Sequence, residues 1–117
     1  MRTAHAIGIV LVVIVGGLVA CGGDRISREV GARCDRTADC ADRCLTSSGD
    51  YPDGFCTIDC TDLRECPDDS ECVAREGGVC LMFCRENADC EFLGPSWVCR
   101  EEDLRGGTGK VGVCLGS

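Results

Sequence analysis

Cysteine spacing constrains the fold of this chain more than any other feature. Of the thirteen cysteines, all but one lie between Cys34 and Cys114, and they form three sets of four. The sets occupy residues 34–56, 60–80 and 84–114, with three residues between one set and the next. The members are Cys34, Cys40, Cys44 and Cys56; Cys60, Cys66, Cys72 and Cys80; and Cys84, Cys90, Cys99 and Cys114.

The three sets share features besides their cysteines. In each set the first two cysteines enclose five residues, and the last of the five is acidic, namely Asp39, Glu65 and Asp89. Each set also closes on Gly-x-Cys, at residues 54–56, 78–80 and 112–114. Constant ends with variable middles are typical of a tandem repeat, so insertions between the sets' cysteines fall in loops.

Disulfides explain these cysteines better than a metal does. Large apolar residues are few and show no sustained helical period, so burial alone does not offset the entropy of ordering the chain. Disulfides contribute about 2–4 kcal/mol each. Structural zinc sites favour Cys-x2-Cys or Cys-x4-Cys pairs, often with histidine, whereas the short gaps here are three and five residues and the single histidine is His5. We therefore expect a small, disulfide-rich, mostly irregular fold of three four-cysteine modules with short strands and helical turns, and no metal or cofactor.

The disulfide pairing stays open at this stage. Four cysteines allow three pairings within each set, and the short links also permit bridges between neighbouring sets. We favour the interlocked pattern, first with third and second with fourth, which is common in small cystine modules.

Local structure is expected to be sparse. Residues 35–44 predict one or two helical turns with Thr37 as the N-cap, which would place Cys40 and Cys44 on one face. The Gly-x-Cys segments predict short strands, most clearly at residues 111–114. Turn-forming residues predict loops over residues 47–54 and 100–110.

The N-terminus reads as an export signal. Arg2 precedes an uncharged apolar run over residues 6–20. A helix of that length spans about 22 Å, which is short for a hydrocarbon core of about 30 Å. The charged start and the small residues at the end favour a signal peptide over residues 1–20 rather than a membrane anchor.

The residues that follow the apolar run specify the kind of signal. Leu18-Val19-Ala20-Cys21 resembles the lipobox of bacterial lipoproteins. The resemblance implies cleavage before Cys21, attachment of diacylglycerol to its thiol and acylation of the new amine. Parity agrees, because an odd cysteine count leaves one cysteine unpaired and Cys21 is the one outside the repeats.

The lipobox resemblance also implies a location. The protein would be held in the bacterial cell envelope through its N-terminal lipid. Residues 21–33 would then consist of the lipidated cysteine and a flexible tether. Gly22 stands where an aspartate often marks retention in the inner membrane, so the outer membrane is preferred. The repeats themselves are similar to the cysteine-rich modules of uncharacterised bacterial surface lipoproteins, as in Cys60–Cys72, and to the N-terminal cysteine-rich region of Dickkopf-type secreted proteins. These likenesses imply a location and a build rather than an activity.

Charge and composition narrow the function. From Cys34 onward eighteen acidic residues face eight basic ones, a net charge of −10. Nucleic acid needs a basic footprint and is not an expected partner. With no histidine after His5, the Ser-His and Cys-His catalytic arrangements are absent, and we expect no enzyme. Residues 50–54 and 68–71 are the best candidates for calcium, but they lack the order of an EF-hand loop and are interpreted as solvated turns.

Two functional classes remain. The first is a surface interaction or envelope-structural module that presents loops to a protein or glycan. Phe92 and Trp97 are its candidate contact residues, because aromatic side chains carry interface energy, although Trp97 is as well suited to covering a disulfide in the core. The second class is a protease inhibitor of the small cystine-module type, with Arg105 or Lys110 entering a trypsin-like pocket. The glycines around these residues argue against the preorganised loop that such inhibitors need.

Overall fold

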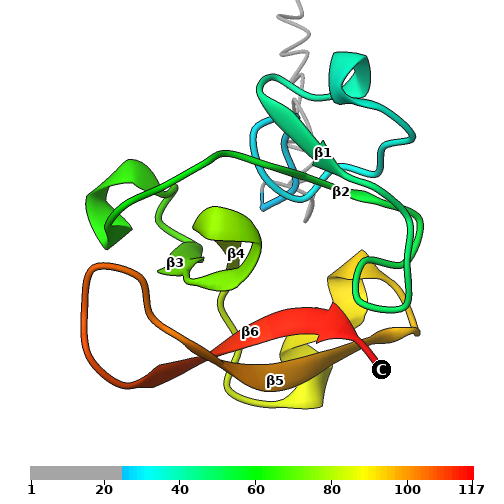
Figure 1. The fold of residues 1–117 in the computed structure, drawn as a ribbon. Coiled ribbons are helices and arrows are strands. Elements are labelled where there is room, and N and C mark those ends of the chain that lie inside the picture. Colours follow the sequence, from blue (N-terminus) through cyan, green and yellow to red (C-terminus); the bar gives the residue numbers. More distant parts are fainter. Residues whose placement is uncertain (1–24) are drawn as a thin grey trace, which may run out of the picture.

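The computed structural model of the chain describes residues 25–117, which form three modules of similar build (Figure 1). In each module a short 3-10 turn precedes an antiparallel hairpin. The first module contains η1 (Thr37–Asp39), β1 (Arg43–Leu45) and β2 (Phe55–Thr57). The second contains η2 (Leu63–Glu65), β3 (Ser70–Val73), η3 (Arg75–Gly77) and β4 (Val79–Met82). The third contains η4 (Asn87–Leu93), β5 (Trp97–Asp103) and β6 (Lys110–Gly116). The expected fold class, disulfide-rich and mostly irregular with short strands and helical turns, is confirmed.

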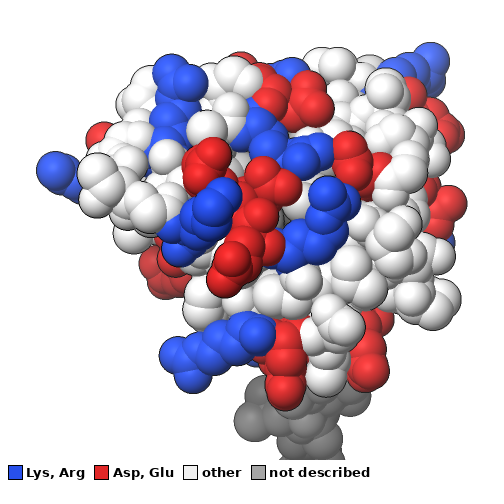
Figure 2. Space-filling view, turned by 60° about the horizontal axis from the view of Figure 1, so that its bottom comes forward, with Lys and Arg blue, Asp and Glu red and all other residues white. Residues whose placement is uncertain are grey.

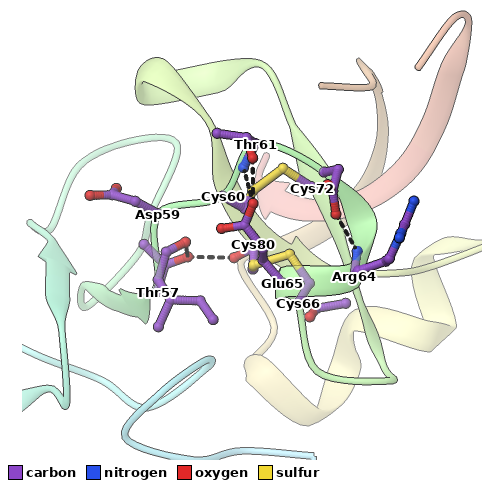
Figure 3. The surroundings of a disulfide bond; sticks show 12 residues. Thr57, Asp59, Cys60, Thr61, Arg64, Glu65, Cys66, Cys72 and Cys80 are labelled. Carbon is purple, nitrogen blue, oxygen red and sulfur yellow. Dashed lines mark hydrogen bonds between the residues drawn. A yellow bond between two sulfur atoms is a disulfide. The ribbon is translucent and has the colours of Figure 1, made fainter. Parts of the chain in front are cut away.

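Hairpin register explains how the disulfides form. The third and fourth cysteines of each module lie directly opposite each other, as Cys44↔Cys56, Cys72↔Cys80 and Cys99↔Cys114. Opposite residues of an antiparallel pair share one face, so each hairpin presents two sulfur atoms to the turn beside it. The first and second cysteines of the module, which flank the turn, each form a disulfide with one of these sulfur atoms, as Figure 3 shows for the second module.

The resulting pairing is interlocked in every module, as the sequence analysis favoured. The six bridges are Cys34–Cys44, Cys40–Cys56, Cys60–Cys72, Cys66–Cys80, Cys84–Cys99 and Cys90–Cys114. The Cα–Cα distances run from 5.4 to 6.0 Å, within the usual range for a disulfide. No bridge joins two modules within residues 25–117.

The repeated acidic residue holds the turn of each module. An Asp89 carboxylate oxygen accepts hydrogen bonds from the backbone N–H groups of Arg85 at 2.8 Å and Glu86 at 3.2 Å. Asp39 receives the equivalent pair from Asp35 and Arg36, at 2.9 and 3.2 Å. In the second module the backbone N–H of Thr61 donates to the Glu65 carboxylate at 3.0 Å. These bonds favour the charged form and lower the carboxyl pKa of Asp39 and Asp89, and hydrogen bonds from Thr61 lower that of Glu65.

A pH-dependent contribution to stability follows from these carboxylates. Because their pKa is lower in the folded chain, they stabilise it above the unfolded value of about 4, and this contribution is lost as the pH falls through the folded pKa. The variant Asp89→Asn should therefore melt below the parent protein at pH 7, with the difference closing toward pH 2. Melting curves from pH 2 to 7 measure this. An equal gap at every pH would mean that the charge of Asp89 does not matter.

The Gly-x-Cys segments are required by backbone packing. A Cβ atom on Gly54 would collide with the carbonyl oxygen of Cys34, one on Gly78 with that of Cys60, and one on Gly112 with that of Cys84. In each module the glycine thus lies against the backbone of the first cysteine. In the second and third modules a hydrogen bond accompanies this contact, since the Cys60 N–H donates to the Gly78 carbonyl and the Cys84 N–H to the Gly112 carbonyl, each at 3.0 Å. In the first module the Cys34 N–H donates instead to the Asp53 carbonyl at 3.4 Å.

Each three-residue link pairs with both of the modules that it joins. Its first residues extend the strand of the preceding module, since Thr57 pairs with Arg43, and Leu81 and Met82 pair with Glu71 and Ser70. Its later residues contact the following module. The Cys80 N–H donates to the carbonyl of Ile58 at 3.2 Å, and Phe83 forms a bridge with Val113. The segment before the first module behaves in the same way, since the Cys56 N–H donates to the carbonyl of Ala32 at 2.8 Å. In the first two modules the residue two positions before the first cysteine, Ala32 or Ile58, thus pairs with the closing cysteine.

The flexible tether predicted for residues 22–33 is wrong for residues 25–33. Val30 is only 1% exposed and joins the main core. The Gly31 N–H donates to the Cys56 carbonyl at 2.9 Å, and the carbonyl of Arg28 accepts from Ala41 at 2.8 Å. One apolar side chain and the strand-like pairing with the first module fix this segment, despite its mixed charges. Residues 1–24, which include the expected signal peptide and lipobox, lie outside the described residues.

The three modules share one hydrophobic core and do not each form a separate domain. Its buried side chains come from all three, including Leu45, Tyr51, Phe55, Val73, Val79, Leu81, Met82, Leu93, Trp97, Val113 and Leu115. In Figure 1 the β3–β4 hairpin lies between the other two, and the loop after β1 reaches the end of β6. There the Gly116 N–H donates to the Asp50 carbonyl at 2.8 Å. Within residues 25–117, only the Cys34, Cys40 and Cys56 cluster forms a separate small core.

An arginine of the second module connects it to both neighbours. Arg75 forms salt bridges with Asp50 at 2.7 Å and Glu102 at 2.9 Å, and its Nε donates to the Tyr51 hydroxyl at 3.3 Å. Arg100 adds a further bond to Asp50 at 3.1 Å. Burial raises the pKa of the Tyr51 phenol, so it stays a neutral partner in this network. Figure 2 shows the β5–β6 side of the molecule, where acidic and basic side chains are interleaved.

Two local predictions need correction. Thr37 is the first residue of η1 rather than its N-cap, and Cys44 lies in β1, so Cys40 and Cys44 share no helix face. The turn ends at Asp39 because the backbone of Cys40 is extended, with a φ of −113° and a ψ of 161°. The loop predicted over residues 100–110 is shorter, because β5 continues to Asp103 and β6 begins at Lys110. The strands expected at the Gly-x-Cys segments are present as β2, β4 and β6.

Candidate functional site: a charged aromatic hollow

The cysteines predicted as site residues are structural in the described part of the chain. In each module three sulfur atoms, which belong to its two bridges, lie within 4.8 Å of one another. Every cysteine from Cys34 to Cys114 is oxidised in a bridge, so these clusters present no thiolates. Cys21, the predicted lipidation site, lies outside the described residues. Within residues 25–117 no helix is long and apolar enough to cross a bilayer.

Trp97 is a core residue and not a contact residue. Its side chain is 5% exposed and packs against Phe55 with ring centroids 5.6 Å apart. Of the two roles that the sequence allowed for Trp97, the structure supports the place in the core and not the surface contact, since Phe55 of another module gives its indole an apolar partner. Phe92 is half-buried on the outside of η4 and remains accessible.

Phe92 lines a hollow of about 250 Å³, which we call the Phe83 hollow. Its lining residues are Arg25, Asp68, Asp69, Met82, Phe83, Arg85, Asp89 and Phe92. A second hollow of about 230 Å³ shares four of these residues, Arg25, Asp68, Asp69 and Met82, and extends to Val30 and Pro67. The N-terminal segment, the second module and the third module thus meet at one surface.

Two arginines lie over the aromatic rings of the hollow. The Arg25 guanidinium carbon is 5.6 Å from the centroid of Phe92, and that of Arg85 is 5.8 Å from the centroid of Phe83. In the part of the chain that the structure describes, neither arginine forms a salt bridge with a carboxylate. Their donors are therefore available to a ligand, while the rings hold the charges in place.

Phe83 was not predicted as a contact residue from the sequence. In the structure it is 38% exposed. Its backbone is held on both sides, because its N–H donates to the Asp69 carbonyl at 3.0 Å and it forms the bridge with Val113. The sequence did offer a signal, since the link Leu81-Met82-Phe83 is apolar throughout. The structure buries the first two of these side chains and leaves the third exposed.

The acidic residues of the hollow differ in their freedom. Asp89 is committed to its turn, as described above, whereas the carboxylates of Asp68 and Asp69 accept no hydrogen bond among residues 25–117. In the other calcium candidate, Asp50 is neutralised by Arg75 and Arg100. That pairing favours the interpretation of residues 50–54 as a structural turn.

The two cations considered for an inhibitory loop are engaged with the fold. Lys110 lies in β6 and pairs with Asp103 at 3.1 Å. The Arg105 N–H donates to the carbonyl of Cys72 at 3.0 Å, and its side-chain stem lies against Gly78. Residues 106–109 form the tip of the loop between β5 and β6, so neither Arg105 nor Lys110 lies at that tip.

No protein-family model, curated protein or solved structure matches this chain. The lowered carboxyl pKa values of Asp39, Glu65 and Asp89 have structural causes, namely the hydrogen bonds that hold the turns. Chemically, the Phe83 hollow can bind a small group that carries both charges, through guanidinium donors, free carboxylates and aromatic faces.

Proposed function

We propose that this chain is a lipoprotein of the bacterial cell envelope, anchored by an acylated Cys21, and that its three modules form a rigid surface or envelope-structural body without catalysis. The observation that carries the proposal is the pairing of all twelve repeat cysteines in six bridges. Cys21 is thus the one cysteine of the chain that the repeats do not use. Its place after the apolar run and the lipobox-like residues supports acylation.

The packing of residues 25–33 supports a body held close to its membrane. Cys21 and Arg25 are four positions apart in the chain, so their Cα atoms are at most about 14 Å apart. This is shorter than the reach of roughly 20 Å expected of a twelve-residue coil. Multiple acyl chains at Cys21 would give stable anchoring, whereas one chain alone would not. We place the protein in the outer membrane, since Gly22 lacks the aspartate of inner-membrane retention.

Structural roles for the charged groups support a role outside catalysis. The repeated acids hold turns, Arg75 joins the modules, and the sulfur atoms are all oxidised. The engagement of Arg105 and Lys110 with the fold favours this function over protease inhibition. A trypsin assay separates the two, because an interaction module should leave trypsin fully active.

Replacing the lipid-accepting residue tests the anchor. In a bacterial host, Cys21→Ser should shift the protein from the membrane fraction to the soluble fraction, because the serine hydroxyl does not replace the thiol in diacylglycerol transfer. Gly23→Ala, two residues away, is the matched control and should stay in the membrane until detergent is added. A Cys21→Ser protein that still carries the acyl-sized mass increment would contradict the proposal.

A further inference from the structure

The Phe83 hollow is close in sequence to the proposed lipid anchor. Arg25, four positions after Cys21, lines the hollow directly. If Cys21 is acylated, Arg25 is at most about 14 Å from the lipid attachment point. The headgroup layer adds about 6 Å outside the hydrocarbon on each side of a bilayer. The hollow therefore lies within side-chain reach of the headgroups or among them.

Two of the three large exposed hydrophobic side chains among the described residues belong to this part of the molecule, Phe83 in the hollow and Ile26 next to Arg25 in the chain. Among residues 25–117 three large hydrophobic side chains are exposed: Ile26 at 39%, Phe83 at 38% and Leu63 at 53%. Ile26 adjoins Arg25 in the chain, and Phe83 shares the hollow with it. Aromatic rings and arginine stems are favoured at the membrane–water interface, where one end is apolar and the other is hydrated.

The charges of the hollow match one kind of headgroup. Arg25 and Arg85 present guanidinium donors that no described carboxylate pairs with, and guanidinium binds phosphate in a bidentate manner. Asp68 and Asp69 also line the hollow and can receive an ammonium group. Phosphate next to ammonium is the arrangement of a zwitterionic phospholipid.

We propose that the Phe83 hollow seats the headgroup of a zwitterionic phospholipid, such as phosphatidylethanolamine, from the membrane that holds the lipid anchor. The proposal rests on the proposed function, since it takes the anchor at Cys21 as given. The body then lies against the bilayer with Phe83 and Phe92 at the interface, and the remaining modules face outward.

Charge argues for a zwitterionic rather than an anionic lipid. From Cys34 onward the chain carries a net charge of −10, so an anionic surface repels the body as a whole. The hollow itself has two arginines against three aspartates, one of which is held by its turn. A headgroup of no net charge avoids the repulsion and still uses both signs.

Tryptophan placed at the rim reports contact with lipid. We would compare the variants Phe83→Trp and Leu63→Trp in the acylated protein, reconstituted into phosphatidylethanolamine–phosphatidylcholine vesicles whose lipids are brominated near the top of the acyl chains. Both positions are exposed, and Leu63 lines none of the hollows described here, so it is the matched control. Trp97 is buried in both proteins and gives the same background.

The expected result is a loss of the added emission for Phe83→Trp and little loss for Leu63→Trp. Replacing part of the lipid with phosphatidylglycerol should weaken the quenching, and Arg85→Gln in the Phe83→Trp protein should weaken it as well. Equal quenching at both positions, or quenching of Phe83→Trp only with anionic lipid, would overturn the inference. So would full access of acrylamide to the added indole of the Phe83→Trp protein in vesicles, which would leave the hollow free for a protein or glycan.

The mass of the same sample separates the two proposals. An acylated chain whose Phe83→Trp emission is not quenched refutes the headgroup site and leaves the anchor standing. A membrane sample without acyl mass refutes the anchor itself, and the headgroup site with it.

Discussion

Replacing Gly54 with alanine is expected to lower the free energy of unfolding by about 2–4 kcal/mol, because the change combines two penalties. Gly54 has a φ of +80°, a region that residues with a Cβ rarely adopt. Its Cβ would also meet the carbonyl oxygen of Cys34, which is backbone and has little freedom to move. Guanidinium unfolding followed by Trp97 fluorescence measures the loss.

Two other glycines separate these penalties. Gly112 has an ordinary φ, but its Cβ would strike the carbonyl of Cys84, so Gly112→Ala retains only the collision. Gly49 has open space around its Cβ position and no left-handed φ, and Gly49→Ala should change stability by less than about 0.5 kcal/mol. If Gly54→Ala were no more harmful than Gly49→Ala, the proposed contact between each glycine and the first cysteine of its module would be wrong.

Removing the Cys90–Cys114 bridge should have the other large effect. The bridge closes the longest loop of the six, with a sequence separation of 24, and both cysteines are fully buried in the shared core. Chain entropy alone predicts a loss of about 3.5 kcal/mol for the double variant Cys90→Ala/Cys114→Ala. Because the core joins all three modules, we expect the whole fold to loosen, which near-ultraviolet circular dichroism and denaturant unfolding both report.

The Cys34–Cys44 bridge is the matched comparison. It has a sequence separation of 10 and belongs to the separate small cluster of the first module. Chain entropy predicts a loss of about 2.8 kcal/mol for Cys34→Ala/Cys44→Ala, and the environment of Trp97 should change little. Global loosening in this variant, with a native-like Trp97 signal in the Cys90→Ala/Cys114→Ala protein, would contradict a core shared between modules.

Features repeated in the sequence proved the most predictable. Cysteine spacing indicated three modules and favoured the interlocked pairing, and Gly-x-Cys indicated the strands at β2, β4 and β6. The acidic residue before the second cysteine was visible as a pattern, but its role was not. A carboxylate that accepts backbone N–H groups four and three residues earlier in the chain leaves no signature beyond its position.

Features that depend on contacts between modules were not predictable. Trp97 is buried because Phe55, forty-two residues earlier, packs against it, and Val30 is buried because the first module pairs with its neighbours. The strand β5 carries Arg100, Glu101 and Glu102, which were expected to form one loop with the glycines that follow them, yet pairing with β6 orders them. The Phe83 hollow needs three segments at once, so no single stretch of sequence reveals it.

The intact mass of the protein extracted from membranes, before and after reduction, tests the central claim most directly. We expect a chain that begins at Cys21 and carries an acyl-sized increment, and a gain of twelve hydrogen atoms on reduction, two for each of the six bridges. A chain without the acyl increment would contradict the anchor. A chain that gains no mass on reduction would contradict the interlocked modules on which the fold depends.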